Sequence, residues 1–181
     1  MFVSREDAGK KLSLVLEKFK EESPIILAIP RGGIVTAYET IKKFGFEWDL
    51  IIPRKIGAPH NKEIAIGAIS LDETYIFNEK YIDMQNISME YIQKEVLEQT
   101  EEIKRRLKKY KGNVNFPNVK NKTVIIIDDG IATGFTIQAA IKSIRKHNAK
   151  KIILAIPVAT QNTISLLEKI VDEIICLFIP Y

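Results

Sequence analysis

The chain has 181 residues, of which 46% are hydrophobic and 28% charged, and this suits one soluble domain with a full core. The net charge of +4 favours anionic ligands without by itself indicating nucleic acid, and the single cysteine, Cys176, excludes an internal disulfide. No apolar run approaches the ~20 residues that span a bilayer, and the first residues lack the apolar core of a signal peptide, so we expect a cytoplasmic protein with no membrane partner.

The first part of the chain predicts helices and strands in alternation. Ser4 and Asp7 have the spacing of a capping box, and Gly45 is a typical helix stop. Trp48 carries no motif and is expected to pack in the core. In chain order, the expected elements are a helix over 5–21, a strand over 25–29, a helix over 34–44, a strand over 49–53, a loop over 54–64 and short antiparallel strands over 64–77.

The second part continues the alternation after one long charged helix. The expected elements are a helix over 88–111, a strand over 123–128, a helix over 136–148, a strand over 151–157, a helix over 161–170 and a strand over 173–179. Strands that alternate with helices imply a parallel sheet covered on both faces. We therefore predict an α/β fold with an open, mainly parallel, five-stranded sheet, plus a small cover region.

The most informative segment is VIIIDDGIATGFT, residues 124–136. A buried parallel strand reads as a continuous run of Val and Ile, and this run ends in Asp128 and Asp129. The carboxyl ends of such strands are where open α/β sheets bind ligands. Two carboxylates can hold vicinal hydroxyls or a metal, and the loop after them offers backbone N–H groups and a helix N-terminus to a phosphate. The segment therefore has the parts needed to bind a sugar phosphate.

This pattern resembles the signature of the type I phosphoribosyltransferases, which use phosphoribosyl pyrophosphate (PRPP). The resemblance implies that Asp128 and Asp129 hold the ribose hydroxyls and that both are possible ligands of Mg²⁺, directly or through water or ribose. It also implies that the turn after the two acids wraps the 5′-phosphate. The residues implied for that turn are Gly130, Ala132, Thr133, Gly134 and Thr136, with the two threonines contributing hydroxyl groups as well.

A second segment, AIPRGG at residues 28–33, also comes after a predicted strand. Arginine can bind phosphate oxygens in a bidentate manner, and glycines let backbone amides approach an anion. In the resembled family the equivalent loop binds pyrophosphate, often through a cis peptide. The resemblance thus implies that Arg31, Gly32 and Gly33 bind pyrophosphate and that the bond between Pro30 and Arg31 is cis. A helix-opening turn with a surface arginine is the structural alternative.

The third segment, residues 53–67, has Arg54 and Lys55 directly after a predicted strand. The resembled family covers its active site with a flexible loop near here, which implies that these two cations neutralise the leaving pyrophosphate and that Glu63 takes part in catalysis. His60 and Asn61 are further candidates for closing contacts, although an exposed loop histidine is the simpler interpretation of His60.

Taken together, these motifs and the opening residues SREDAG resemble the "predicted phosphoribosyltransferase" group over essentially the whole chain. The resemblance implies one domain over residues 1–181, Mg²⁺ as cofactor, a homodimer, and PRPP with a small-molecule acceptor as partners. It implies that Ser70–Lys120 and the C-terminal tail form the acceptor-side cover. Composition rich in Ile, Lys and Glu also points towards a thermophile.

Other functions stay open. The chain has neither the GxxxxGK[ST] of P-loop nucleotidases nor the GxGxxG of dinucleotide folds. Ala132 disfavours a hypoxanthine or guanine enzyme, since relatives that act on 6-oxopurines place Asp there. The main alternative is a non-catalytic, PRPP-sensing regulator that binds nucleic acid through the basic end of the long helix, residues 104–111. A solvated helix end is the simpler interpretation of that run of cations, so nucleic acid is not the expected partner.

Overall fold

We describe a computed structural model of the chain, which covers residues 2–131 and 134–180. The chain forms two compact units, each described here by itself. Unit 1 consists of Met1–Ile51, Pro117–Gly134 and Ile144–Tyr181, and unit 2 of Ile52–Phe116 and Phe135–Ser143. Helix α5 (Phe135–Lys146) is divided between them.

Unit 1 is built on a five-stranded, fully parallel sheet. Its spatial order is β2 (Glu47–Leu50), β1 (Ile25–Ala28), β6 (Thr123–Ile127), β7 (Lys151–Val158) and β8 (Glu173–Phe178). The central strand β6 is buried along its whole length and pairs with β1 from Ile25 opposite Val124 to Ala28 opposite Ile127. Strands β1 and β6 therefore end side by side, which places the segments after them at one edge of the sheet.

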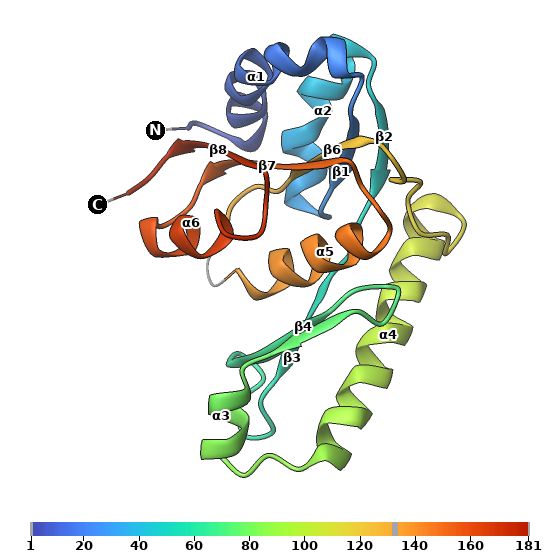
Figure 1. The fold of residues 1–181 in the computed structure, drawn as a ribbon, viewed down its shortest axis with the longest axis vertical. Helices are drawn as coiled ribbons and strands as arrows, with labels where there is room; N and C mark the ends of the chain where they lie inside the picture. Colours follow the sequence, from blue (N-terminus) through green and yellow to red (C-terminus); the bar gives the residue numbers. More distant parts are fainter. Residues whose placement is uncertain (1, 132–133, 181) are drawn as a thin grey trace. The chain divides into compact units, whose positions relative to one another are not determined.

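Helices cover both faces of this sheet, as the alternating pattern predicts (Figure 1). Helices α1 (Arg5–Leu16) and α2 (Gly32–Phe44) pack against each other on one face, while α6 (Gln161–Leu167) lies on the opposite face. A 3-10 helix, η1 (Glu17–Glu22), continues α1. Helix α2 ends at Gly45, whose φ of 67° is in the left-handed region that glycine favours.

The edge strand of the sheet differs from its prediction. It was expected over 49–53, but β2 spans Glu47–Leu50, and the buried residues after it lie outside the strand. Trp48, expected in the core, has 52% of its surface exposed. The reason is that β2 is the edge strand of the sheet and pairs on one side only. The buried residues in this part of the chain are therefore not the same as the residues that pair with β1.

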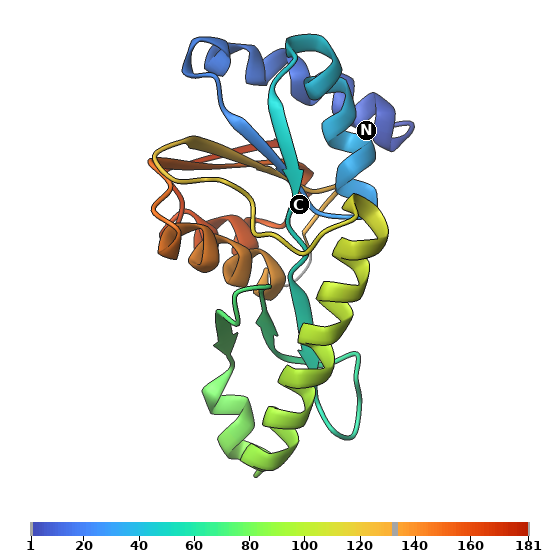
Figure 2. The same ribbon diagram turned by 90° about the vertical axis from the view of Figure 1, so that its right-hand side faces the viewer.

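Unit 2 combines a three-stranded antiparallel sheet with a long helix. The sheet order is β3 (Arg54–Gly57), β4 (Ala65–Ile69) and β5 (Tyr75–Phe77), and α4 (Met89–Lys111) packs along β3 and β4 (Figure 2). A short helix, α3 (Glu79–Met84), was not predicted. Ser88 caps α4 by accepting a hydrogen bond from the N–H of Tyr91, and Gly112 ends the helix with a φ of 76°.

The prediction of a continuous loop over 54–64 is wrong in its first four residues. Arg54–Gly57 forms strand β3, with Arg54 opposite Ile69 and a register shift between Ile56 and Gly57. Two cations followed by Ile and Gly have no strand periodicity, so the strand arises from pairing with β4 rather than from local preference. The antiparallel strands expected over 64–77 are confirmed as β4 and β5.

One half of the predicted capping box at the start of α1 is confirmed and gives a first prediction; the Asp7 carboxylate accepts from the N–H of Val3 at 3.1 Å. The Oγ of Ser4 accepts a hydrogen bond from the N–H of Asp7 at 3.2 Å. We expect Ser4→Ala to lower the free energy of unfolding by about 1 kcal/mol, because one helix N–H loses its acceptor. Urea denaturation measures this, with Ser165→Ala on the exposed side of α6 as a control that removes a serine hydroxyl away from any cap. Equal changes in the two variants would contradict the cap assignment.

Candidate functional site

The two acids of the central motif lie directly after the buried strand β6. Asp128 and Asp129 are half-buried, and the N–H of Asp129 donates to Oδ1 of Asp128 at 2.8 Å. The five residues before them are fully within the core of the sheet. The strand therefore holds this pair rigidly at the carboxyl edge of the sheet, as the sequence predicts.

Burial raises the pKa of the Asp128 carboxyl to about 7, and the neighbouring Asp129 adds to the increase. The hydrogen bond from the N–H of Asp129 acts in the opposite direction but is outweighed. Asp128 is thus a carboxyl group whose charge depends on pH near neutrality, at the edge of the sheet where open α/β folds bind ligands.

The loop after the two acids leads into α5. Ile131 forms a bridge with Ala159 after β7, and Gly134 has a φ of 78°, a conformation that favours glycine. Thr136 lies in the first turn of α5. Ala132 and Thr133, both expected at the 5′-phosphate, lie outside the described residues.

The segment after β1 lies beside the two acids. The peptide bond between Pro30 and Arg31 is cis, as the resemblance implies. A Cβ added to Gly33 would lie 2.7 Å from the carbonyl oxygen of Ile127 and 3.0 Å from Cα of Asp128, so only glycine lets the two strand ends come this close. Among the described residues, no side chain caps the N-terminus of α2 at Arg31. The N–H of Ile34 donates to the carbonyl oxygen of Arg31 at 3.3 Å, so the N–H groups of Gly32 and Gly33 before it are the ones that could serve an anion.

The structure adds Arg5, which we did not predict from the sequence as a site residue. Its Nε donates to Oδ2 of Asp129 at 2.6 Å. Arg5, Arg31, Gly32 and Val35 line a hollow of about 490 Å³. A signal was present in the sequence, since an arginine stands at the first helical position of SREDAG, but nothing local shows that it faces a residue 124 positions away.

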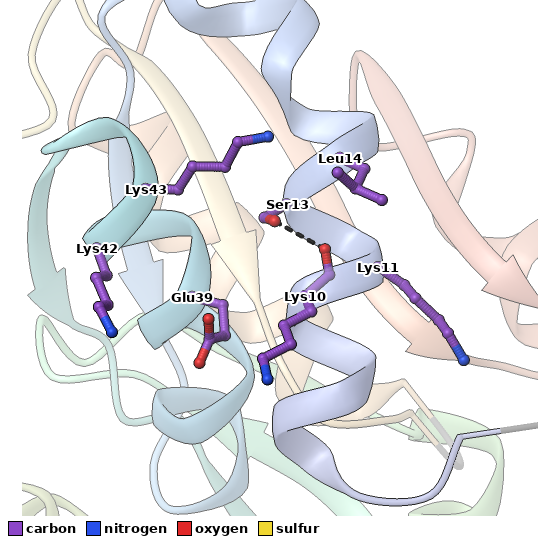
Figure 3. Close-up of a pocket in the computed structure, with 7 residues that line it drawn as sticks. All are labelled: Lys10, Lys11, Ser13, Leu14, Glu39, Lys42 and Lys43. Carbon is purple, nitrogen blue, oxygen red and sulfur yellow. Dashed lines mark hydrogen bonds between the residues drawn. The ribbon is translucent and has the colours of Figure 1, made fainter.

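A second hollow in unit 1, of about 450 Å³, lies between α1 and α2 (Figure 3). Its cations are Lys10, Lys11, Lys42 and Lys43, and it also contains Glu39. The ammonium groups of Lys11 and Lys43 are already bound to Asp7 at 2.9 Å and to Glu17 at 3.0 Å. This hollow has no residue from the predicted motifs, so we assign the candidate site to the acids after β6.

The remaining predicted site residues belong to unit 2. Arg54 is half-buried and its Nε donates to Oε1 of Gln99 on α4 at 3.0 Å; burial and, after it, the charge of Arg106 lower the pKa of the Arg54 guanidinium. Lys55 pairs with Glu63 at 3.0 Å, and the Glu63 side chain is 88% exposed. The structure brings these two together and leaves both accessible, whereas it holds Arg54 against α4.

The loop that joins β3 to β4 is attached to α4 through Lys62. Its ammonium group donates to Oε1 of Glu95 and, at 2.8 Å, to the hydroxyl of Tyr91, which itself donates to the carbonyl oxygen of Gly57 at 2.7 Å. Only 4% of the Glu95 side chain is exposed. We did not predict this buried carboxylate, because a glutamate in a charged helix is normally a surface residue. His60 and Asn61 in the same loop are exposed.

The first three cations of the basic end of α4, Lys104, Arg105 and Arg106, are paired with carboxylates within the helix. Glu101 pairs with Lys104 at 2.9 Å, and Glu102 pairs with both Arg105 and Arg106 at 2.6 Å. The hydrogen bonds from these two arginines lower the pKa of Glu102 to about 2. Cations that are paired with carboxylates have less charge to offer phosphates, which favours the interpretation of a solvated helix end.

Two kinds of feature are absent from the described residues. Within 2–131 and 134–180, no helix has the length and apolar character needed to cross a bilayer. Likewise, no three His, Cys, Asp or Glu side chains in this part of the chain gather as a metal-binding group would. Asp128 and Asp129 fit the different pattern of Mg²⁺, which is bound by one or two carboxylates together with water and substrate phosphates.

Comparison with known proteins identifies related chains. A family model described as a phosphoribosyl transferase domain matches residues 5–178. A Mycobacterium tuberculosis protein (strain ATCC 25618 / H37Rv), named a "putative phosphoribosyl transferase", is 30% identical over 180 residues, which make up 99% of this chain and 41% of that protein. The chain thus spans less than half the length of this curated relative.

Solved structures show the same fold. A crystal structure from Thermus thermophilus has a TM-score of 0.77 and 28% identity, covering 99% of this chain and 85% of that one. A purine phosphoribosyltransferase from Pyrococcus horikoshii has a TM-score of 0.52 and 18% identity, covering 93% and 81%. At that identity the second likeness concerns the fold alone, and it agrees with the parallel sheet and flanking helices described above.

Proposed function

Because the chain belongs to the phosphoribosyl transferase domain family, we propose that it transfers the phosphoribosyl group of PRPP to a nitrogen acceptor and releases pyrophosphate. The observation that carries this proposal is the position of Asp128 and Asp129, which come after the central strand beside the uncapped start of α2. Hydroxyl-binding carboxylates and anion-binding N–H groups are the two requirements of a ribose diphosphate, and unit 1 has both at one edge of its sheet.

In this proposal the two acids accept hydrogen bonds from the ribose hydroxyls. The loop that leads into α5 binds the 5′-phosphate with backbone N–H groups and hydroxyls. The residues proposed for this phosphate site are Gly130, Ala132, Thr133 and Gly134 of the loop, together with Thr136 in the first turn of α5. Arg31, Gly32 and Gly33 bind the diphosphate, through a guanidinium group and through the N–H groups at the start of α2.

Cleavage of the C1–O bond leaves positive charge on the ribose and negative charge on pyrophosphate. The chain's own contribution is to position both partners and to stabilise the developing charges. We propose that Arg54 and Lys55 neutralise the leaving group and that Glu63, which Lys55 holds, makes a closing contact. Asp128 and Asp129 would hold Mg²⁺, which supplies positive charge to the pyrophosphate and ribose oxygens when bound.

The acceptor is proposed to be a nucleobase or a related heterocycle. Ala132 has no polar group for a 6-oxopurine, which argues against hypoxanthine and guanine. We assign the acceptor side to Ser70–Lys120 and the C-terminal tail, within a single functional domain, and we propose that the protein acts as a homodimer in the cytoplasm.

Thermal unfolding with PRPP, in the presence and absence of Mg²⁺, tests the first half of this function. A ligand at ~100 times its dissociation constant stabilises a protein by about 2.7 kcal/mol, so we expect a clear, magnesium-dependent rise in Tm. An assay of pyrophosphate release with a panel of nitrogen heterocycles tests the second half. No rise in Tm at saturating PRPP would refute the proposal. A rise without pyrophosphate release for any acceptor would favour a PRPP-sensing regulator.

A further inference from the structure

Arg5 has a fixed place at the candidate site. It is the first residue of α1, and Ser4 caps the helix directly before it. Helix α1 is in turn tightly packed on α2: a Cβ added to Gly9 would lie 2.5 Å from the carbonyl oxygen of Thr36. The packing of the two helices therefore sets where the Arg5 backbone lies relative to Gly32, the first residue of α2.

The guanidinium group of Arg5 occupies space that a side chain at position 32 would fill. A Cβ on Gly32 would lie 1.9 Å from Oδ2 of Asp129 and 2.8 Å from Nε of Arg5. The ion pair between Arg5 and Asp129 thus crosses directly over the start of α2, where the diphosphate is proposed to bind. Surface pairs such as Lys11 with Asp7 lie within one helix and have no such relation to the site.

Most of the donors of Arg5 remain available. Among the described residues, the guanidinium group is bonded through Nε alone, to Asp129 at 2.6 Å. Its two Nη groups carry four further N–H donors in a rigid fork that matches phosphate oxygens. The side chain is 60% exposed and lines the hollow of about 490 Å³ together with Arg31 and Gly32.

We propose that Arg5 is a diphosphate-binding residue that also positions Asp129. In this arrangement Nε holds one carboxylate oxygen of Asp129, and the Nη groups donate to diphosphate oxygens beside Arg31. A single guanidinium group then links the acid that binds the ribose to the anion that leaves. The inference rests on the proposed function, since it needs PRPP to be the ligand of this site.

The experiment compares PRPP with two compounds that each correspond to one part of it. Isothermal titration calorimetry, with Mg²⁺ present, measures binding of PRPP, pyrophosphate and ribose 5-phosphate to the wild type, Arg5→Met and Arg5→Lys. Lys10→Met is the matched control, because Lys10 lies on the same helix but lines the hollow of Figure 3 instead. Thermal unfolding of each variant without ligand checks that it is folded.

We expect Arg5→Met to weaken PRPP and pyrophosphate binding by about 10- to 30-fold, because charge-assisted hydrogen bonds to the diphosphate are lost. The binding of ribose 5-phosphate, which lacks the diphosphate, should weaken by no more than about 3-fold. The affinity of Arg5→Lys should lie between those of Arg5→Met and the wild type. Its single ammonium group keeps the charge but lacks the separate Nε and Nη donors that would bind Asp129 and the diphosphate. Lys10→Met should bind all three ligands like the wild type.

Two outcomes would overturn the inference while leaving the proposed function intact. If PRPP and pyrophosphate bind Arg5→Met within about 2-fold of the wild type, Arg5 is a surface ion pair only. If Arg5→Met weakens the binding of ribose 5-phosphate as strongly as that of PRPP, Arg5 acts through Asp129 alone and does not bind the diphosphate. Failure of the wild type to bind PRPP or pyrophosphate would instead remove the proposed function, and this inference with it.

Discussion

Asp128→Asn is expected to weaken PRPP binding by about 10- to 100-fold while making the ligand-free protein more stable at pH values above neutrality. Both effects have one cause. A half-buried carboxylate next to a second acid is unfavourable in the folded state, yet it is the group proposed to accept the ribose hydroxyls. Asparagine keeps the oxygen that accepts from the N–H of Asp129 and removes the charge.

The direction of the stability change is given by the raised pKa. Burial first, and the neighbouring Asp129 second, raise the pKa of Asp128 from 3.8 to about 7. Between these values the folded state binds a proton that the unfolded state has lost, so the free energy of unfolding of the wild type falls as the pH rises. Asn does not titrate. At about 1.36 kcal/mol per pKa unit, the variant should therefore exceed the wild type by about 4 kcal/mol above neutrality, and this advantage should disappear near pH 4.

Urea denaturation across this pH range measures stability, and calorimetry at about pH 8 measures PRPP affinity. Asp83→Asn is the control, because Asp83 is an exposed aspartate on α3 of unit 2. In the wild type, PRPP affinity should also fall as the pH drops below about 7, since protonated Asp128 loses an acceptor. A variant that binds PRPP as tightly as the wild type would show that Asp128 is not part of the ribose site.

The second large effect is expected at Lys62. Lys62→Met should lower the free energy of unfolding by about 2–4 kcal/mol, because it leaves Glu95 buried without its partner. Glu95 is 3% exposed, whereas the Lys62 side chain is 56% exposed, so the loss arises from the stranded carboxylate rather than from lost packing. Urea denaturation measures the change. Lys94→Met is the control, since the contact of Lys94 with Glu98, at 3.9 Å, is exposed on both sides.

One further measurement separates a stranded charge from other causes. Adding Glu95→Gln to Lys62→Met should recover most of the lost stability, because an amide is cheaper to bury than an unpaired carboxylate. A deficit that is the same with Glu95→Gln would mean that Lys62 acts through Tyr91 and not through Glu95.

The sheet of unit 1 was predictable because its signals are local. Strand β6 is a continuous run of apolar residues, the cap at Ser4 has a known spacing, and Gly45 ends its helix where expected. Strand β3 was not predictable, because Arg54–Gly57 becomes a strand only by pairing with β4. The same holds for Trp48, whose exposure depends on lying at the sheet edge.

For the candidate site, the sequence by itself determined which residues come after the strands: the acids after β6 and the Pro30–Gly33 segment after β1. Their chemistry can be recognised from residue type and order, since a strand end and the loop after it are adjacent in the chain. Only the tertiary structure decided that Arg5 reaches Asp129 and that Lys62 neutralises Glu95. These contacts join residues 124 and 33 positions apart, and the packing of helices and strands, rather than any local pattern, brings such residues together.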